Sequence, residues 1–144
     1  MHTIANKTLI HALLLALQES DLLRYIALDQ GQADEDLEGN RYIGMKYPAA
    51  LIDIQNERVE KVARDLLSAE ADIAIRLFFD TPLIANMAAP QSHIDAVTEH
   101  YDVMEKVIKV MKDCQLYYRG FTRGTRERSI VELILHFKAT GHIY

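Results

Sequence analysis

Six histidines and one cysteine are the residues of this 144-residue chain best suited to metal binding or proton transfer. His93 and His100 are seven residues apart on a predicted helix, so they lie on roughly one face but about 10 Å apart along its axis. That separation is too long for one metal ion, because a zinc site on a helix uses residues four apart. We therefore expect neither a metal site nor a cofactor.

The remaining chemical candidates also favour structural roles. His136 lies in the predicted last strand, on the face away from the core. Cys114 follows a predicted helix, whose negative dipole end raises the pKa of a thiol and does not activate it. The sequence contains no G-x-S-x-G, no phosphate-binding glycine loop and no H-E-x-x-H motif. It also pairs no carboxylates as acid and base, so it predicts a protein that is not an enzyme.

Charge is concentrated in two segments of opposite sign. The segment that precedes the last strand is rich in arginine and contains Gly120 and Gly124, which favour a turn, whereas residues 29–38 hold five carboxylates and no basic residue. Arginine binds carboxylates through its planar fork, so we predict contacts with proteins, including head-to-tail pairing of identical subunits. A solvated hairpin tip and a contact with nucleic acid are the alternatives for the arginine segment. The predicted interaction residues are Arg119, Arg123, Arg126, Arg128, Asp34, Glu35, Asp36 and Glu38.

Composition limits the class of protein. The formal net charge of −5 argues against a nucleic-acid binder, because phosphate binding depends on positive surface. The longest apolar run, residues 12–17, is too short to span a bilayer. A lone cysteine fits a reducing, cytoplasmic setting. The length fits one domain, residues 1–144.

Hydrophobic periodicity predicts two helices and several strands. Apolar residues recur at helical spacing over residues 4–18 and from Ser92 to about Asp113. Residues 57–69 fit a helix as well as a hairpin, and periodicity leaves this choice open. The short connections favour a mostly antiparallel sheet with two helices on one face, which is an α+β domain. The predicted strands cover residues 24–28, 42–55, 71–80 and 129–139.

Several stretches together resemble the small tail-completion proteins of tailed phages and prophages, the tail terminator or head–tail joining group. The N-terminal helix contains LIHALLLALQ, and residues 47–52 read YPAALI, like the start of a strand in that group. Arg64-Asp65-Leu66 and the strand ADIAIRLFF follow at the right interval, and RERSIVELILHFKAT resembles the closing strand. The resemblance covers nearly the whole chain.

The resemblance implies both a fold and a role. It implies a helix-β-β-β-helix-β-β order, with a hairpin over residues 57–69. It also implies a homo-oligomeric ring, commonly a hexamer, that caps the tail tube and joins it to the head connector. Such a protein is present in the host cytoplasm during assembly and then in the virion tail. The alternatives are a small cytoplasmic ligand-binding domain or enzyme that uses His93, His100 and Arg76, and an adaptor without symmetry.

Overall fold

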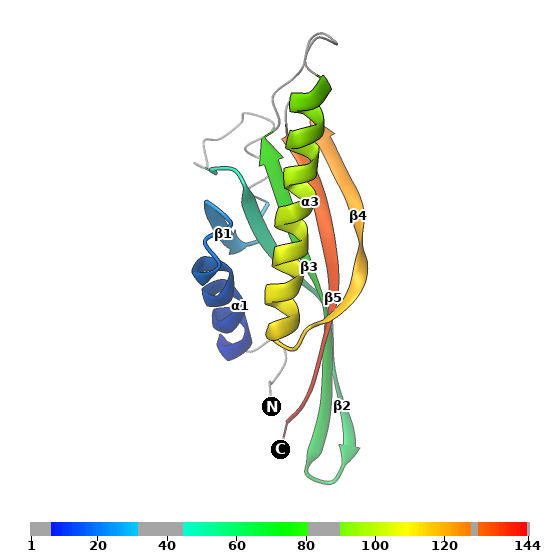
Figure 1. Cartoon of the computed structure of the whole chain (residues 1–144). Coiled ribbons are helices and arrows are strands. Elements are labelled where there is room, and N and C mark those ends of the chain that lie inside the picture. The colour runs from blue at the N-terminus through cyan, green and yellow to red at the C-terminus, as the bar shows by residue number, and fades with distance from the viewer. Residues whose placement is uncertain (1–6, 32–44, 81–89, 128–129, 144) are drawn as a thin grey trace.

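One five-stranded sheet is covered on one face by two helices in the part of the chain that the structure describes (Figure 1). The computed structural model describes residues 7–31, 45–80, 90–127 and 130–143. The strand order is β1-β2-β3-β5-β4, in which β1 and β2 are parallel and all other neighbours are antiparallel. These findings confirm the predicted α+β class and its element order. The elements are α1 (Lys7–Glu19), β1 (Tyr25–Leu28), β2 (Ala49–Ala63), β3 (Leu66–Asp80), α3 (Pro90–Asp113), β4 (Tyr117–Glu127) and β5 (Ile130–Ile143).

The main core lies between the sheet and the helices. Alternate residues of β3, such as Ile75 and Leu77, are fully buried and face Leu13 of α1 and Val107 of α3. This period of two places the neighbouring residues on the opposite face. Phe78 therefore belongs to a smaller apolar cluster there, together with Met45, Ala49, Leu51 and Ile130.

The helix ends show why the chain turns where it does. Asp21 has φ 56° just after α1, and Gln115 has φ 67° just after α3. Leu116 donates its N–H to the carbonyl oxygen of Met111 at 3.2 Å, which closes α3 and starts the path into β4. α3 begins at Pro90 and not at the predicted Ser92, because proline fits the first turn, where no N–H donor is needed. Neither described helix is both long and apolar enough to cross a membrane.

Residues 57–69 form the hairpin that the resemblance implied and not a helix. β2 and β3 pair from Ala49 opposite Phe78 to Ala63 opposite Leu66. The apolar side chains that gave this stretch its helical period include Val59 and Val62, which are each 59% exposed. Their spacing therefore does not mark a buried helix face.

The far end of this hairpin projects beyond the helices as an arm (Figure 1). The arm consists of residues 55–63 of β2, residues 66–71 of β3 and residues 139–143 of β5. Every one of residues 55–63 is exposed. The main core thus includes Ala69, Ala71 and Ala139 of the arm, whereas the β2 part of the arm is exposed.

We expect Leu13→Ala in α1 to lower the free energy of unfolding by about 2–5 kcal/mol, because it leaves a cavity in the main core. Leu15 is the matched control, since it lies in the same helix but is 53% exposed. Leu15→Ala should change stability by less than about 0.5 kcal/mol. Urea denaturation measures both. Equal losses in the two variants would contradict the packing of α1 on the sheet.

Candidate functional site

The arginine-rich segment is a strand, and the turn predicted from its glycines is wrong. β4 pairs with β5 along its length, with irregularities after Tyr118 and Arg123. Gly120 lies at the first irregularity with φ 115°, a conformation that residues with a Cβ rarely adopt. A Cβ on Gly124 would overlap the carboxyl group of Glu132. The glycines therefore mark a bulge and a close approach within the sheet.

The described arginine side chains leave β4 on opposite faces. Arg119 lies 3.9 Å from the Asp72 carboxylate on the open face, whereas Arg123 donates a 2.7 Å hydrogen bond to the Tyr101 hydroxyl of α3. Both arginines are exposed. The structure thus places them along one edge and not in one loop. Arg126 also belongs to β4, and the other predicted interaction residues lie outside the described part of the chain: Arg128, Asp34, Glu35, Asp36 and Glu38.

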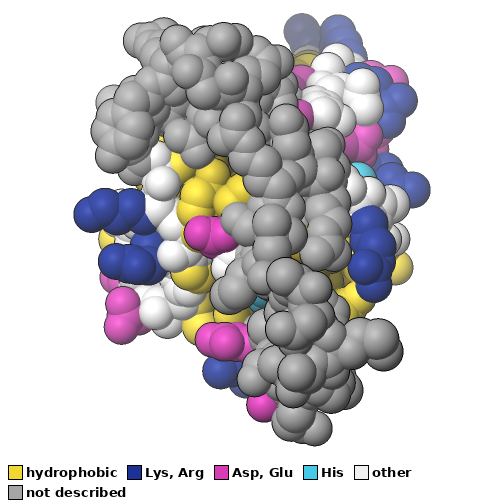
Figure 2. Space-filling model, turned by 90° about the horizontal axis from the view of Figure 1, so that it is seen from above, with side chains coloured by type: hydrophobic (Ala, Val, Ile, Leu, Met, Phe, Trp, Pro, Cys, Tyr) yellow, Lys and Arg dark blue, Asp and Glu magenta, His cyan; other side chains and the backbone are white. Residues whose placement is uncertain are grey.

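Aromatic side chains accompany these arginines on β4. Tyr117 is 72% exposed, and Phe121 is 39% exposed while its ring meets Tyr101 edge-on at 6.2 Å. Tyrosine, phenylalanine and arginine are the residues enriched in protein interfaces. Seen from above, the described basic side chains lie on both sides of the molecule with acidic side chains among them (Figure 2). The β4 edge therefore has the composition of a protein contact, within a surface of mixed charge.

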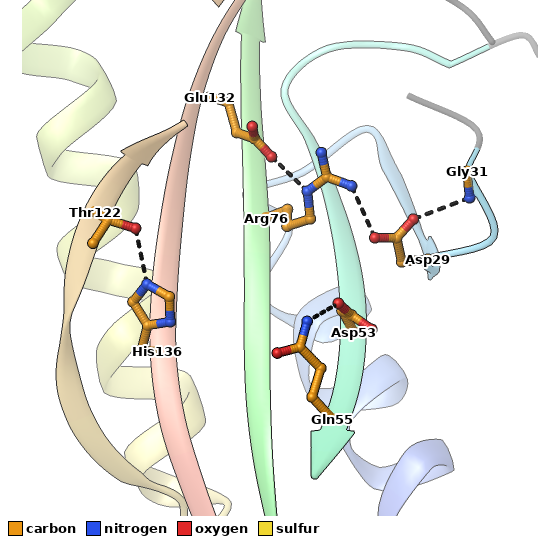
Figure 3. Close-up of polar contacts among 8 residues, drawn as sticks. All are labelled: Asp29, Gly31, Asp53, Gln55, Arg76, Thr122, Glu132 and His136. Atoms are coloured by element: carbon orange, nitrogen blue, oxygen red, sulfur yellow. Dashed lines mark hydrogen bonds and ion pairs between the residues drawn. The ribbon is translucent and has the colours of Figure 1, made fainter. Parts of the chain in front are cut away.

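A partly buried ion-pair cluster joins β3, β5 and the residue that follows β1 on the open face of the sheet (Figure 3). Arg76 of β3 donates from Nε to Glu132 of β5 at 2.5 Å and from Nη1 to Asp29 at 2.8 Å. The side chain of Glu132 is 3% exposed, and the guanidinium also lies over the Phe78 ring, 5.1 Å from its centre. We call Asp29, Arg76 and Glu132 the Arg76 cluster. It ties the residue that follows β1 to the centre of the sheet.

The guanidinium of Arg76 stays charged. Burial alone would lower the pKa of the Arg76 guanidinium, but its hydrogen bonds to Glu132 and Asp29 outweigh burial and raise that pKa. Asp29 also accepts a 3.1 Å hydrogen bond from the Gly31 N–H. The first carboxylate of the acidic segment is therefore engaged within the chain and is not available to a partner.

Sequence reasoning placed Arg76 away from the core but did not find its partners. The sequence did contain a signal for this ion pair. Arg76 and Glu132 are each the one Asp, Glu, Lys or Arg in a largely apolar stretch, IAIRLFF and IVELILHF. Charges in such strands are rarely buried unless they are paired. Asp29 gave no signal, because it stood among several acidic residues.

A shallow groove of about 360 Å³ lies on the open face below the Arg76 cluster. Asp72, Arg119, Thr122 and His136 contribute to its lining. The Thr122 hydroxyl and Nε2 of His136 are hydrogen-bonded at 2.9 Å, which is the geometry of a nucleophile and its base. Within the described residues, no hydrogen bond orients the other nitrogen of His136, so the third member of a triad is missing.

The pocket predicted from His93, His100 and Arg76 does not form as expected. His100 stacks on Phe79 on the helix side of the sheet, with ring centres 4.3 Å apart, whereas Arg76 lies on the other face. The side chain of His93 is outside the described part. Burial lowers the pKa of His100, although the charge of Glu99 opposes this shift. The cavity beside His100 has a volume of about 140 Å³. It is smaller than the pockets that usually bind substrates or cofactors.

Cys114 is a half-buried thiol at the end of α3. Burial and the charge of Asp113 both raise its pKa, so the structure agrees with the predicted direction but assigns the larger cause to burial. A raised pKa disfavours the reactive thiolate. Among the described residues, no three His, Cys, Asp or Glu side chains are grouped to hold a metal ion.

We expect Arg76→Met to lower the free energy of unfolding by about 3–5 kcal/mol, because it leaves the buried Glu132 carboxylate without its cation. The double variant Arg76→Met/Glu132→Met should regain part of this loss, since it removes that carboxylate as well. Arg58→Gln is the control: Arg58 pairs with Glu70 on the arm but is 60% exposed, so its loss should cost at most about 1 kcal/mol. Urea denaturation that ranks Arg58→Gln as the most damaging variant would contradict the role of the cluster.

Comparison with known proteins identifies no family for this chain. No protein-family model matches it, and no curated protein matches it either. The account of the site therefore rests on the β4 edge, the arm and the Arg76 cluster themselves.

Proposed function

We propose that this chain is a non-enzymatic structural protein of a phage or prophage tail. It acts as a tail terminator or neck component and forms an oligomeric ring that joins the tail tube to the head connector. It assembles in the host cytoplasm and remains in the virion tail. The sequence resemblance suggests this role, and the projecting arm is the structural observation that carries it.

The arm supports contact with other proteins through its β2 strand, whereas Ala69, Ala71 and Ala139, on its β3 and β5 strands, belong to the core of the chain. The β2 part of the arm is exposed throughout, and Val59 and Val62 each expose 59% of their surface. Exposed apolar residues on a long strand attract strand pairing and aggregation, which soluble monomers usually avoid with short or charged edges. Neighbouring subunits that cover this strand would explain why the chain keeps apolar residues there.

The arm is also stiff enough to position a contact. β3 runs through it between β2 and β5, so the arm has three hydrogen-bonded strands for much of its length. Arg58, Glu70 and Lys138 form ion pairs across these strands. A rigid projection of this kind suits a ring subunit, in which each copy must meet its neighbours and the tail tube in fixed geometry.

We expect the purified chain, mixed with the tail-tube protein encoded in the same genome, to form rings at the tube ends. Electron microscopy and light scattering measure this assembly. The variant Val59→Lys/Val62→Lys should reduce capping at least tenfold, because it places two charges on the arm. Leu15→Lys, on α1 and 53% exposed, should cap like the parent chain.

Two results would contradict the proposal. One is a wild-type chain that remains at 16.4 kDa with and without tube protein. The other is a chain that stays monomeric but gains thermal stability with a small ligand, which would support the ligand-binding alternative.

A further inference from the structure

We propose that the β4 edge of one copy pairs with the β2 edge of the arm of a second copy, so that the partner of each surface is this same chain. This inference rests on the proposed function and deepens it, because it names the surfaces through which copies in the ring meet. The two surfaces lie on different strands, so the contact is heterologous and leaves one of each surface open for the next copy.

Both edges have backbone groups available for pairing. β4 is the last strand of the sheet, and its only strand neighbour in the described part of the chain is β5. On the other side, β1 pairs with only the first four of the fifteen residues of β2, so no described strand covers the outer edge of the remaining eleven, residues 53–63. β4 is also eleven residues long. The two free edges therefore match in length, at roughly 35 Å each.

The side chains on the two edges complement each other in shape and polarity. β4 offers the exposed rings of Tyr117 and Phe121, whereas the arm offers the exposed Val59 and Val62. Aromatic and β-branched residues form the favourable cross-strand pairs of sheets. Such pairs would bury most of the large exposed hydrophobic side chains of the described sheet.

Charge favours this pairing over a symmetric one. β4 presents Arg119 and Arg123, which stay exposed although Arg119 lies 3.9 Å from the Asp72 carboxylate and Arg123 donates to the Tyr101 hydroxyl, so two β4 edges placed together would repel each other. The arm presents Glu57 and Glu60, which are exposed and form no ion pair with other described residues, together with Arg58, which pairs with Glu70, and the exposed Lys61. The arm edge is therefore the better acceptor for the β4 arginines, through the charge-assisted bonds that arginine and carboxylate form.

Nucleic acid is the competing occupant for a strand that carries arginine and exposed aromatic rings. The net charge of −5 opposes it, because association with phosphates is governed by the field of the whole protein. An eleven-residue free edge with matching valines also has no role in binding a nucleic-acid strand. A second copy explains the edge, the rings and the arginines together.

Cross-linking of cysteine variants tests this proposal on the full chain. In a Cys114→Ser background, one preparation carries Tyr117→Cys and the other Val59→Cys, at positions 72% and 59% exposed. A short bismaleimide should link the mixture into dimers at least tenfold more than either preparation alone. A chain with both cysteines should give a ladder of higher multimers. Leu15→Cys in place of Val59→Cys is the matched control and should not link above background.

Charge reversal then tests the interface itself. Arg119→Glu/Arg123→Glu on the Tyr117→Cys partner should lower the cross-link yield about tenfold, and Glu57→Arg/Glu60→Arg on the Val59→Cys partner should restore it. Circular dichroism confirms that each variant is folded.

Three outcomes would overturn the inference. They are a mixture that links no better than its components, Tyr117→Cys alone linking as well as the mixture, and β4 arginines that bind a labelled single-stranded oligonucleotide without any cross-link. Tube capping is scored separately. Capping without cross-links removes only this inference, whereas cross-links without capping contradict the phage-tail role.

Discussion

The pairing of β3 with β5 is the constraint on which the rest of this structure depends. Fourteen consecutive residues of β3, Leu67 to Asp80, lie opposite residues of β5, and β2 pairs along the other side of β3. At one end of the sheet these strands carry the core against α1 and α3. At the other end the same strands continue past the helices and become the arm. One continuous ladder therefore connects the stable part of the molecule to the part proposed to meet its neighbours.

The two faces of β3 differ in polarity and in what they contact. One face is apolar and packs under the helices, while the other carries Arg76 between two carboxylates. A buried ion pair adds little stability compared with an apolar contact, but it penalises any register that separates its charges. A shift of β5 by one residue would move Glu132 to the helix side and separate its carboxylate from Arg76. The Arg76 cluster thus fixes the register of the strands that form the arm.

Much of the fold could be predicted from the sequence because alternation and helical spacing are local signals. The strand around Ile75 and Leu77, the long helix and the last strand all follow from them. The arginine segment could not be assigned locally, because Gly120 and Gly124 favour a turn. In the structure Gly120 lies at a bulge, and Gly124 lies against Glu132 on another strand. Residues 57–69 were ambiguous for a related reason. Val59 and Val62 are exposed, so their spacing does not reflect the burial of one face of a helix or strand.

The candidate site was less predictable than the fold. The composition of the β4 edge was visible in the sequence, but its separation onto two faces depends on contacts with Asp72 and Tyr101. The edge of β2 that no described strand covers was not visible in the sequence, because it begins where the pairing with β1 ends. Sequence patterns identify the residues of such a surface, whereas topology decides which backbone edges remain open.

Hydrogen exchange of the wild-type chain at low and high concentration tests the central claim most directly. If copies associate through their sheet edges, backbone amides in residues 53–63 and 117–127 should gain protection together as concentration rises. Amides of α1 and α3 should exchange at the same rate at both concentrations. Protection that rises on the helices while both edges stay unchanged would contradict the account.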